Sequence, residues 1–304
     1  MRWRQLTAFR ETMVTGTASG AADIMGISQP AVSRLIDALE DSLGITLFDR
    51  RTGRMVPTVE AHMFYDELQK AVSSYDRLAA AAEDIRLGRR GSLHIVSMPA
   101  IGLGFLPDAI TDFKAVQPDL KVRYDLQLSI RVEEWVSSQR VDLGIAEFPF
   151  ERPGIERENF CELPYVMALP EAHLLALRDV ITPQDLHGQR MVSLSPETVA
   201  RRLLDACLAK SGVKPQILCE TTYSAGVCAL VRRGQGIGLT DLFTASDFAG
   251  TGVVFRRFAP ELMFHVGILY PKHHSRSRTA GEFLTVLRTK RNKLIAGIDA
   301  LLAV

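Results

Sequence analysis

The spacing of Ala22, Gly26 and Val32 constrains the fold of this 304-residue chain more than any other feature. Ser28 suits the N-terminal cap of a helix, and Pro30 falls in the first turn, where proline is tolerated. A helix-turn-helix needs a small residue where its helices touch, a glycine in the turn and a branched apolar residue in the second helix. An ordinary three-helix bundle could use the same residues, but cap, turn and packing signals together favour the helix-turn-helix.

Three helices and a two-stranded wing account for the first 59 residues. The first helix is predicted from Arg4 to Val14, and the second begins near Thr17 or Ser19. The predicted apolar faces consist of Leu6, Phe9, Met13 and Val14 in the first helix, Ala21, Ala22, Ile24 and Met25 in the second, and Val32, Leu35, Ile36, Leu39 and Leu43 in the third. Leu47 and Phe48 then anchor the wing.

The exposed start of the third helix carries Gln29, Ser33 and Arg34, with Pro30 between them. Such donors and acceptors suit base edges and phosphates in the major groove of DNA. Three further cations, Arg50, Arg51 and Arg54, cluster in the wing loop, where they would reach the DNA backbone or minor groove. The first 59 residues hold seven arginines against six acidic residues, a net charge of +1, so a local patch must supply the phosphate contacts.

From residue 60 to about residue 88 the chain reads as one long helix without glycine or proline before Gly88. Its apolar residues follow a 4-3 heptad spacing at Phe64, Leu68, Ala71, Tyr75, Leu78, Ala82 and Ile85. Such a seam is typical of a dimerising coiled coil. The alternative is a long helix packed on its own domain. Residues 88–92, GRRGS, read as a hinge.

Strands and helices alternate from residue 89 to residue 304, which predicts an α/β domain with parallel, doubly wound sheets. Two such series indicate two lobes, one spanning about 91–163 and 267–304 and the other about 164–266. Ligands in such sheets bind beyond the carboxyl ends of the strands, so the expected site lies between the lobes.

Several protein classes are disfavoured by what the sequence lacks. No GxSxG, GxxxxGK[ST] or HExxH pattern occurs, so we expect no enzyme and no cofactor. The four cysteines show no metal spacing, and Cys228 is expected to be a buried, inert thiol rather than half of a redox pair with Cys219. No membrane span or secretory signal is apparent, which predicts a cytoplasmic protein. A solute-binding or enzymatic α/β protein remains the second class.

The chain resembles the LysR-type transcriptional regulators over essentially its whole length. The resemblance rests on TASGAADIMGISQPAVSRLIDALEDSLGITLFDRR followed by PT, and on LPEAHLLA, ITPQDLHGQRMVSLS and ALVRRGQGIGL. Within the family, EEWVSSQRVDLGIAE, ETTYSAGVCALVRRGQGIG and VVFRRF look most similar to the branch of LysR itself, the diaminopimelate decarboxylase regulator, and of the octopine and nopaline regulators. The resemblance implies a winged helix-turn-helix, a dimerising linker helix and a regulatory domain like a periplasmic binding protein. It also implies a homotetramer that bends double-stranded promoter DNA and adjusts its contacts with RNA polymerase when a small-molecule co-inducer binds.

The resemblance further implies which residues touch the effector. Ser97 matches the usual effector-contacting hydroxyl, and Met98 and Pro99 would shape the pocket. The other candidates lie at corresponding strand ends or turns, namely Ser129, Glu147, Ser193, Ser195, Thr221, Thr222 and Asp241. Because Glu147 and Asp241 could pair an ammonium or guanidinium, we hypothesise an amino-acid-like effector such as a diamino acid or an opine. An organic or aromatic acid effector is the alternative.

Overall fold

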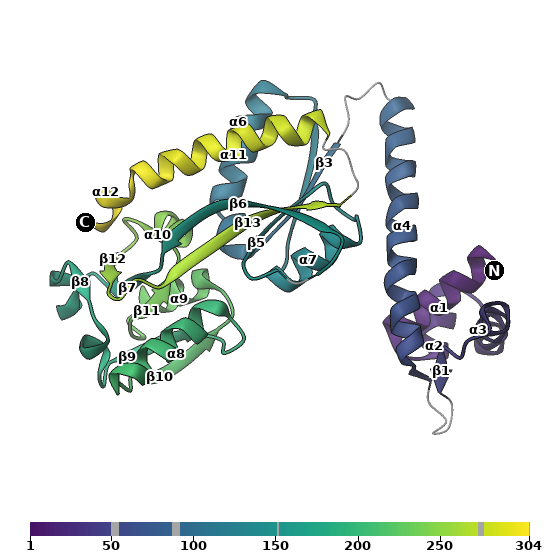
Figure 1. Cartoon of the computed structure of the whole chain (residues 1–304), viewed down its shortest axis with the longest axis horizontal. Coiled ribbons are helices and arrows are strands. Elements are labelled where there is room, and N and C mark those ends of the chain that lie inside the picture. The colour runs from purple at the N-terminus through teal and green to yellow at the C-terminus, as the bar shows by residue number, and fades with distance from the viewer. Residues whose placement is uncertain (50–54, 87–91, 151, 273–276, 304) are drawn as a thin grey trace. The chain divides into compact units, whose positions relative to one another are not determined.

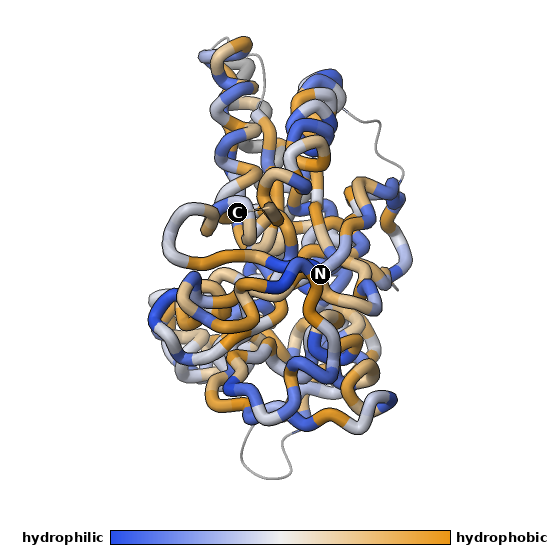
Figure 2. Tube along the Cα trace, turned by 90° about the vertical axis from the view of Figure 1, so that its left-hand side faces the viewer, coloured by the Kyte–Doolittle hydropathy of each residue, from blue (hydrophilic) through white to orange (hydrophobic). Residues whose placement is uncertain are grey.

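The computed structural model describes residues 1–49, 55–86, 92–150, 152–272 and 277–303. The chain separates into two compact units, the first containing Met1–Glu83 and the second most of the remaining residues. Figure 1 shows helices and a short hairpin in the first unit and two mixed α/β lobes in the second. Hydrophobic and hydrophilic residues alternate in every part of the chain (Figure 2), as expected for elements with one buried face.

The N-terminal unit begins with the three predicted helices, α1 (Trp3–Thr15), α2 (Ala18–Met25) and α3 (Gln29–Leu43). Gly26 ends α2 with a φ of 64°, a left-handed conformation that only a residue without Cβ adopts without strain. Ala22 and Val32 are both buried in the core of this unit. The helix-turn-helix prediction is therefore confirmed at its three defining positions.

Three details of these helices differ from the sequence prediction. Val14 is 62% exposed and Ile24 is 59% exposed, so neither belongs to the core. The core is instead completed by Ala8, Ala18 and other small residues that allow the helices to approach closely. Ser28 occupies the N-cap position of α3, but its side chain makes no capping hydrogen bond.

The wing forms as a short antiparallel hairpin of β1 (Phe48–Asp49) and β2 (Val56–Pro57). Leu47 and Phe48 are buried, as predicted. One carboxylate oxygen of Glu40, near the end of α3, accepts hydrogen bonds from the backbone N–H groups of Leu47 (2.6 Å) and Phe48 (3.0 Å). This carboxylate therefore fixes the wing against the end of α3.

A single helix follows, α4 (Val59–Arg86), which is 28 residues long. Its first turns pack on the core of the N-terminal unit through Leu68, which is buried, and Phe64. Further along the seam Tyr75 is 61% exposed and Leu78 is 69% exposed. The side chain of Ile85 lies outside the described residues. The first part of the predicted heptad seam therefore packs within its own unit, and the part around Tyr75 and Leu78 is exposed.

The first lobe of the second unit is built on a five-stranded sheet in the order β4-β3-β5-β13-β6. Its strands are β3 (Ser92–Ser97), β4 (Lys121–Leu126), β5 (Leu143–Glu147), β6 (Ile155–Pro164) and β13 (Met263–Pro271). Its helices are α5 (Pro99–Gly102), α6 (Phe105–Val116), α7 (Ser129–Ser137) and α11 (Arg278–Ala296). Alternation along β3 places Ile95 in the core shared with α6 and α11, and Val96 in the core shared with α7.

The second lobe holds a four-stranded sheet in the order β11-β7-β12-β8 and a separate parallel pair, β10-β9. Its strands are β7 (Val166–Pro170), β8 (Val180–Ile181), β9 (Arg190–Leu194), β10 (Gln216–Thr221), β11 (Gly238–Thr240) and β12 (Val253–Phe258). Its helices are α8 (Val199–Ser211), α9 (Ser224–Val231) and α10 (Leu242–Phe248), with 3-10 turns η1 (Leu174–Leu177) and η2 (Pro183–Leu186).

The sheets are mixed rather than purely parallel, which corrects the prediction. β13 runs antiparallel to both β5 and β6, and β7 runs antiparallel to both β11 and β12. Long β6 and β13 pair along their whole length and carry the chain into and out of the second lobe. The crossover is held by a hydrogen bond from the Tyr165 N–H to the Leu262 carbonyl oxygen (2.7 Å).

The basic C-terminal segment is partly engaged with the first lobe through α11. Arg291 on α11 donates to the carbonyl oxygen of Phe160 (2.6 Å) and lies over its ring, and Lys290 pairs with Asp112 (3.1 Å). The chain then continues into α12 (Ile298–Leu302), which packs on β12 of the second lobe. His273, His274 and Arg276 lie outside the described residues.

Candidate DNA-binding face and effector site

The DNA-binding candidates of α3 lie together on one exposed surface. The Gln29 side chain donates to the Ser33 hydroxyl (3.1 Å), and the Arg34 guanidinium donates weakly to the Pro30 carbonyl oxygen (3.4 Å). Arg34 is exposed, whereas Val32 and Ile36 on the opposite face are buried. Polar side chains at the free N-terminal end of a recognition helix can reach base edges in the major groove.

The cations predicted for the wing, Arg50, Arg51 and Arg54, lie outside the described residues. The hairpin strands on either side are described, and Asp49 pairs with Val56 there. The helix α4 starts directly after the wing. Thr58 closes the junction, because its hydroxyl donates to the Thr46 carbonyl oxygen (2.8 Å) and accepts from the Ala61 N–H (3.1 Å).

In the first lobe, the predicted effector residues gather at the carboxyl ends of β3 and β5. Ser97 is fully buried and donates to the Met98 carbonyl oxygen (3.0 Å), while the Met98 N–H donates to the Ile145 carbonyl oxygen (2.9 Å). Pro99 begins α5. The Ser129 hydroxyl accepts from the Glu147 N–H (3.0 Å), which ties the start of α7 to the end of β5.

Glu147 is the titratable side chain among these first-lobe candidates. The Tyr165 hydroxyl donates to one of its carboxylate oxygens (2.6 Å). The pKa of Glu147 is raised to about 7, mainly by burial and also by the charge of Asp241, whereas the Tyr165 hydrogen bond and the charge of Arg202 act in the opposite direction. Burial likewise raises the pKa of Tyr165, so its hydroxyl remains a donor. A carboxyl group that is half protonated near neutral pH can respond strongly to a nearby ligand charge.

Asp241 belongs to the second lobe, where its carboxylate stabilises the start of a helix. It caps α10, accepting from the Thr244 N–H (2.8 Å) and the Thr244 hydroxyl (2.9 Å), and it is 1% exposed. Burial raises its pKa, and hydrogen bonds from Thr244 and Ser224 oppose that shift. Its influence on Glu147 is therefore through charge. Next to it, the Phe105 ring of the first lobe meets the Phe243 ring of the second at 5.0 Å, edge to face.

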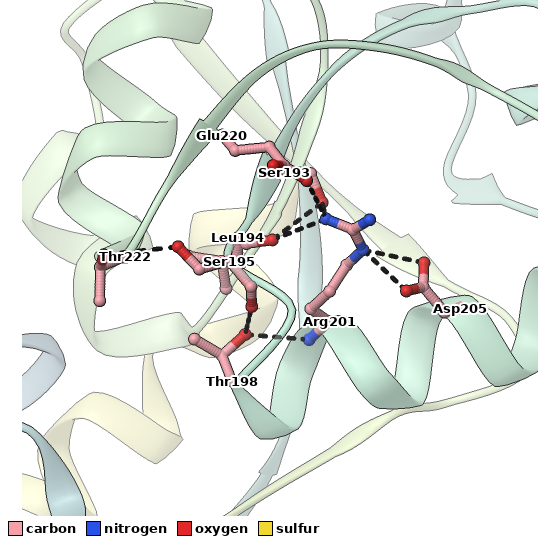
Figure 3. A network of polar contacts seen from close by, with 8 residues as sticks. All are labelled: Ser193, Leu194, Ser195, Thr198, Arg201, Asp205, Glu220 and Thr222. Atoms are coloured by element: carbon pink, nitrogen blue, oxygen red, sulfur yellow. Dashed lines mark hydrogen bonds and ion pairs between the residues drawn. The ribbon is translucent and has the colours of Figure 1, made fainter.

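Three of the second-lobe candidates, Ser193, Ser195 and Thr222, lie near a polar network centred on Arg201 in α8 (Figure 3). One guanidinium nitrogen donates to the Ser193 hydroxyl (3.1 Å), the Leu194 carbonyl oxygen (2.9 Å) and a Glu220 carboxylate oxygen (2.6 Å). Ser193 is 3% exposed and also donates to the Leu194 carbonyl oxygen (3.3 Å). The Ser193 hydroxyl is thus engaged in holding the end of β9.

Ser195 and Thr222 lie next to each other just beyond the ends of β9 and β10. Their hydroxyl oxygens are 3.4 Å apart, and the Ser195 N–H donates to the Thr221 carbonyl oxygen (2.9 Å). Thr221, the last residue of β10, packs against α9, since an added Cβ at Gly226 would lie 2.5 Å from its hydroxyl. Of the predicted second-lobe residues, the structure therefore brings Ser195 and Thr222 together as a hydroxyl pair.

Two residues of this region were missed by sequence reasoning, namely Tyr165 and Arg201. Tyr165 stands in YVMALP and Arg201 in TVARRLLDACLAKSG, where each reads as an ordinary strand or helix residue. No motif marks them, because their partners are brought near only by the fold.

Comparisons with known proteins agree with these observations. Residues 3–62 match the family of bacterial regulatory helix-turn-helix proteins of the lysR family, and residues 86–292 match the LysR substrate binding domain. No helix among the described residues is both long and apolar enough to cross a membrane.

The similarity to curated relatives extends over most of the chain. The chain is 37% identical to the transcriptional activator protein LysR of Escherichia coli (strain K12), over 99% of this chain and 96% of that protein. It is 35% identical to the octopine catabolism/uptake operon regulatory protein OccR of Rhizobium meliloti, over 82% of each. The structure of full-length CbnR complexed with its target DNA matches with a TM-score of 0.70 and 19% identity, over 95% of this chain and 100% of that one, which supports the fold. The chain therefore belongs to the LysR family, and it is a DNA-binding transcriptional regulator with an effector-binding domain rather than an enzyme.

Proposed function

We propose that the effector is an amino acid or derivative with a cationic group, and that this group pairs with Glu147 between the two lobes. One observation supports the proposal above others. The Tyr165 hydroxyl donates to one carboxylate oxygen of Glu147, and the charge of Arg202 acts on Glu147 from a distance, while among the described residues no cation lies in ion-pair contact with it. A largely buried carboxylate with no cation in direct contact is costly, and a ligand ammonium or guanidinium would reduce that cost.

The ligand's own carboxylate would meet hydroxyl donors. Ser195 and Thr222 together offer two adjacent hydroxyl groups beyond the ends of parallel strands, which is where ligands bind in α/β sheets. Ser97, Met98, Pro99 and Ser129 would line the first-lobe side. Asp241, whose carboxylate caps α10, would act at a distance by increasing the negative potential at Glu147.

The relatives support the same ligand class. OccR is described as an octopine catabolism/uptake operon regulatory protein, and octopine is an amino-acid derivative that carries a guanidinium group. For this chain, diamino acids and opines are therefore the ligands to test first. Organic and aromatic acids are the competing class, because hydroxyls and backbone N–H groups bind a carboxylate whether or not the ligand carries a cation.

The proposed assembly follows from the two exposed features of the N-terminal unit. The exposed part of the α4 seam around Tyr75 and Leu78 would pair two chains and so present two copies of α3 to a two-fold promoter site. Pairs of dimers would form a tetramer, and effector binding would change contacts with RNA polymerase.

A binding screen on the full-length protein tests the effector class. Lysine, diaminopimelate, arginine, octopine and nopaline are compared with benzoate and other aromatic acids by thermal shift and then by calorimetry. We expect stabilisation by a cationic amino acid or opine, and a loss of about tenfold or more in affinity in Glu147→Gln. Stabilisation only by anions that are not amino acids would refute the proposal.

Proton release provides a second readout. Because the pKa of Glu147 is about 7, roughly half of the chains hold a proton on this carboxyl at pH 7. A cationic ligand stabilises the ionised form, so binding should release roughly half a proton per chain, measured by calorimetry in buffers of different ionisation enthalpy. Glu147→Gln removes this release.

A further inference from the structure

We propose that Arg201 is a positioning residue of the effector site, which holds the ends of β9 and β10 so that Ser195 and Thr222 present their hydroxyls as a pair. The inference rests on the proposed function in one respect, namely that this pair contacts the effector. Arg201 itself is engaged by Ser193, Leu194, Glu220 and Asp205 (Figure 3).

The contact with β9 is made immediately before the predicted ligand residue. The Arg201 guanidinium donates to the carbonyl oxygen of Leu194 and to the hydroxyl of Ser193, the last two residues of β9. Ser195 follows directly. The orientation of the Leu194 peptide therefore sets the position of the Ser195 backbone and the direction of the Ser195 side chain.

The contact with β10 is made two residues before the other member of the pair. The same guanidinium nitrogen lies 2.6 Å from a carboxylate oxygen of Glu220, and Thr222 follows two residues later. A single nitrogen thus binds the ends of both strands. Charge-assisted hydrogen bonds of this kind are roughly twice as strong as neutral ones.

The need for such a clamp follows from the sheet itself. The parallel ladder of β9 and β10 ends at the pair Leu194 and Thr221, and one further backbone bond, from Ser195 to Thr221, continues it. Beyond that point the two segments enter different helices, α8 and α9. The hydroxyls of Ser195 and Thr222, which are 3.4 Å apart, lie beyond the last backbone pair of the two strands.

Arg201 is also fixed from the other side, which makes it a rigid support. Its guanidinium pairs with Asp205 one turn further along α8 (2.8 Å), and its backbone N–H donates to the capping hydroxyl of Thr198 (3.3 Å). The Arg201 side chain is 11% exposed. Ion pairs that are exposed to solvent contribute little to stability. The guanidinium of Arg201 is shielded from solvent and presents its donors in a rigid planar geometry, so its hydrogen bonds compete less with water.

The neighbouring residue provides a matched control. Arg202 has the same side chain, lies on the same turn of α8 and is exposed. Its guanidinium donates to the backbone carbonyl oxygen of Glu197 (2.6 Å), in the loop before the helix, rather than to the strand ends. Replacing Arg202 removes an equal charge while leaving the contacts to β9 and β10 in place. Because the charge of Arg202 also acts on Glu147, this variant is a control for disulfide closure and not for effector binding.

A disulfide-closure assay measures the positioning without any ligand. Ser195→Cys and Thr222→Cys are introduced together in the full-length protein, and the closure rate in glutathione disulfide is followed by peptide mass mapping. We expect Arg201→Gln to slow closure about tenfold, Arg202→Gln to change it by less than about twofold, and Arg201→Lys to restore part of the rate. Equal closure rates in the Arg201→Gln and Arg202→Gln backgrounds would overturn the proposal.

A second variant covers the case in which Arg201→Gln does not fold, as judged by circular dichroism. Glu220→Gln removes one arm of the clamp and should slow closure by a smaller factor, whereas an unchanged rate would again overturn the proposal. Binding of octopine and lysine to the Arg201 variants is measured separately. Slower closure together with no binding of either ligand to the unaltered protein would support the role of Arg201 and count against the proposed effector class.

Discussion

Replacing Glu147 by glutamine should stabilise the protein at pH 8 and leave its stability at pH 5 nearly unchanged. The pKa of Glu147 is about 7 in the folded chain, and its ordinary value is 4.5. At pH 5 to 6 the folded protein therefore holds a proton that the unfolded chain has mostly lost. The free energy of unfolding then falls as pH rises, by about 1.4 kcal/mol per pH unit across this window.

The magnitude follows from the width of the window. Between pH 4.5 and 7 the free energy of unfolding decreases by about 3 kcal/mol in total, and this decrease is complete once the pH has risen past the pKa of Glu147 in the folded chain. Glutamine carries no charge at any pH, and its carbonyl oxygen can accept the same hydrogen bond from the Tyr165 hydroxyl. The variant should therefore exceed the parent by up to about 3 kcal/mol at pH 8, with no comparable gain at pH 5.

Tryptophan fluorescence during urea unfolding provides the assay. The chain has two tryptophans, Trp3 in the N-terminal unit and Trp135 on α7 of the first lobe. In a Trp3→Phe background the signal comes from Trp135 alone, in the same lobe as Glu147. Unfolding is compared with and without Glu147→Gln at pH 5, 6, 7 and 8. A stability difference that is the same at pH 5 and pH 8 would refute the reasoning.

Three further predictions concern other parts of the molecule. Arg34→Ala should weaken promoter binding by about tenfold in a gel-shift assay while the melting temperature stays unchanged, and a loss of both would indicate misfolding. Gly236→Ala should destabilise the second lobe by about 2 kcal/mol or more in calorimetry, because φ is 138° and the added Cβ would lie 2.4 Å from the Arg190 carbonyl oxygen. Gly234→Ala is the control, having a positive φ of 72° but open space around the added Cβ, so equal losses would contradict the steric argument. Ending the chain after Ala296 removes α12 with Leu302, which is 8% exposed, and should cost about 2 kcal/mol in the same assay; an unchanged melting curve would show that α12 contributes nothing.

The N-terminal unit was the most predictable part of the chain because its signals are local. Gly26 adopts the left-handed turn that its position required, and Val32, Ile36 and Leu39 are buried at helical spacing. The errors at Val14 and Ile24 have a common origin. Periodicity identifies which residues could share a face, but the width of the buried stripe depends on how closely the neighbouring helices pack.

The mixed sheets were not predictable from strand and helix alternation. The sequence of β6, IERENFCELP, has charged residues at several positions and lacks the continuous apolar character of a buried strand. Its charges acquire partners in the fold, where Glu158 pairs with Arg288 of α11. A strand whose polar groups are satisfied by a helix more than a hundred residues away looks like a loop when the sequence is read locally.

The sequence by itself determined the family, the helix-turn-helix and the strand ends that carry Ser97, Glu147, Ser195 and Thr222, since motifs and element boundaries depend on neighbouring residues. The tertiary structure alone decided how these ends are used. In the fold, the Tyr165 hydroxyl donates to Glu147 and the Asp241 carboxylate caps α10. Arg201 hydrogen-bonds to the ends of both β9 and β10. Such pairings are set by burial and distance between separate elements, and a linear pattern contains neither.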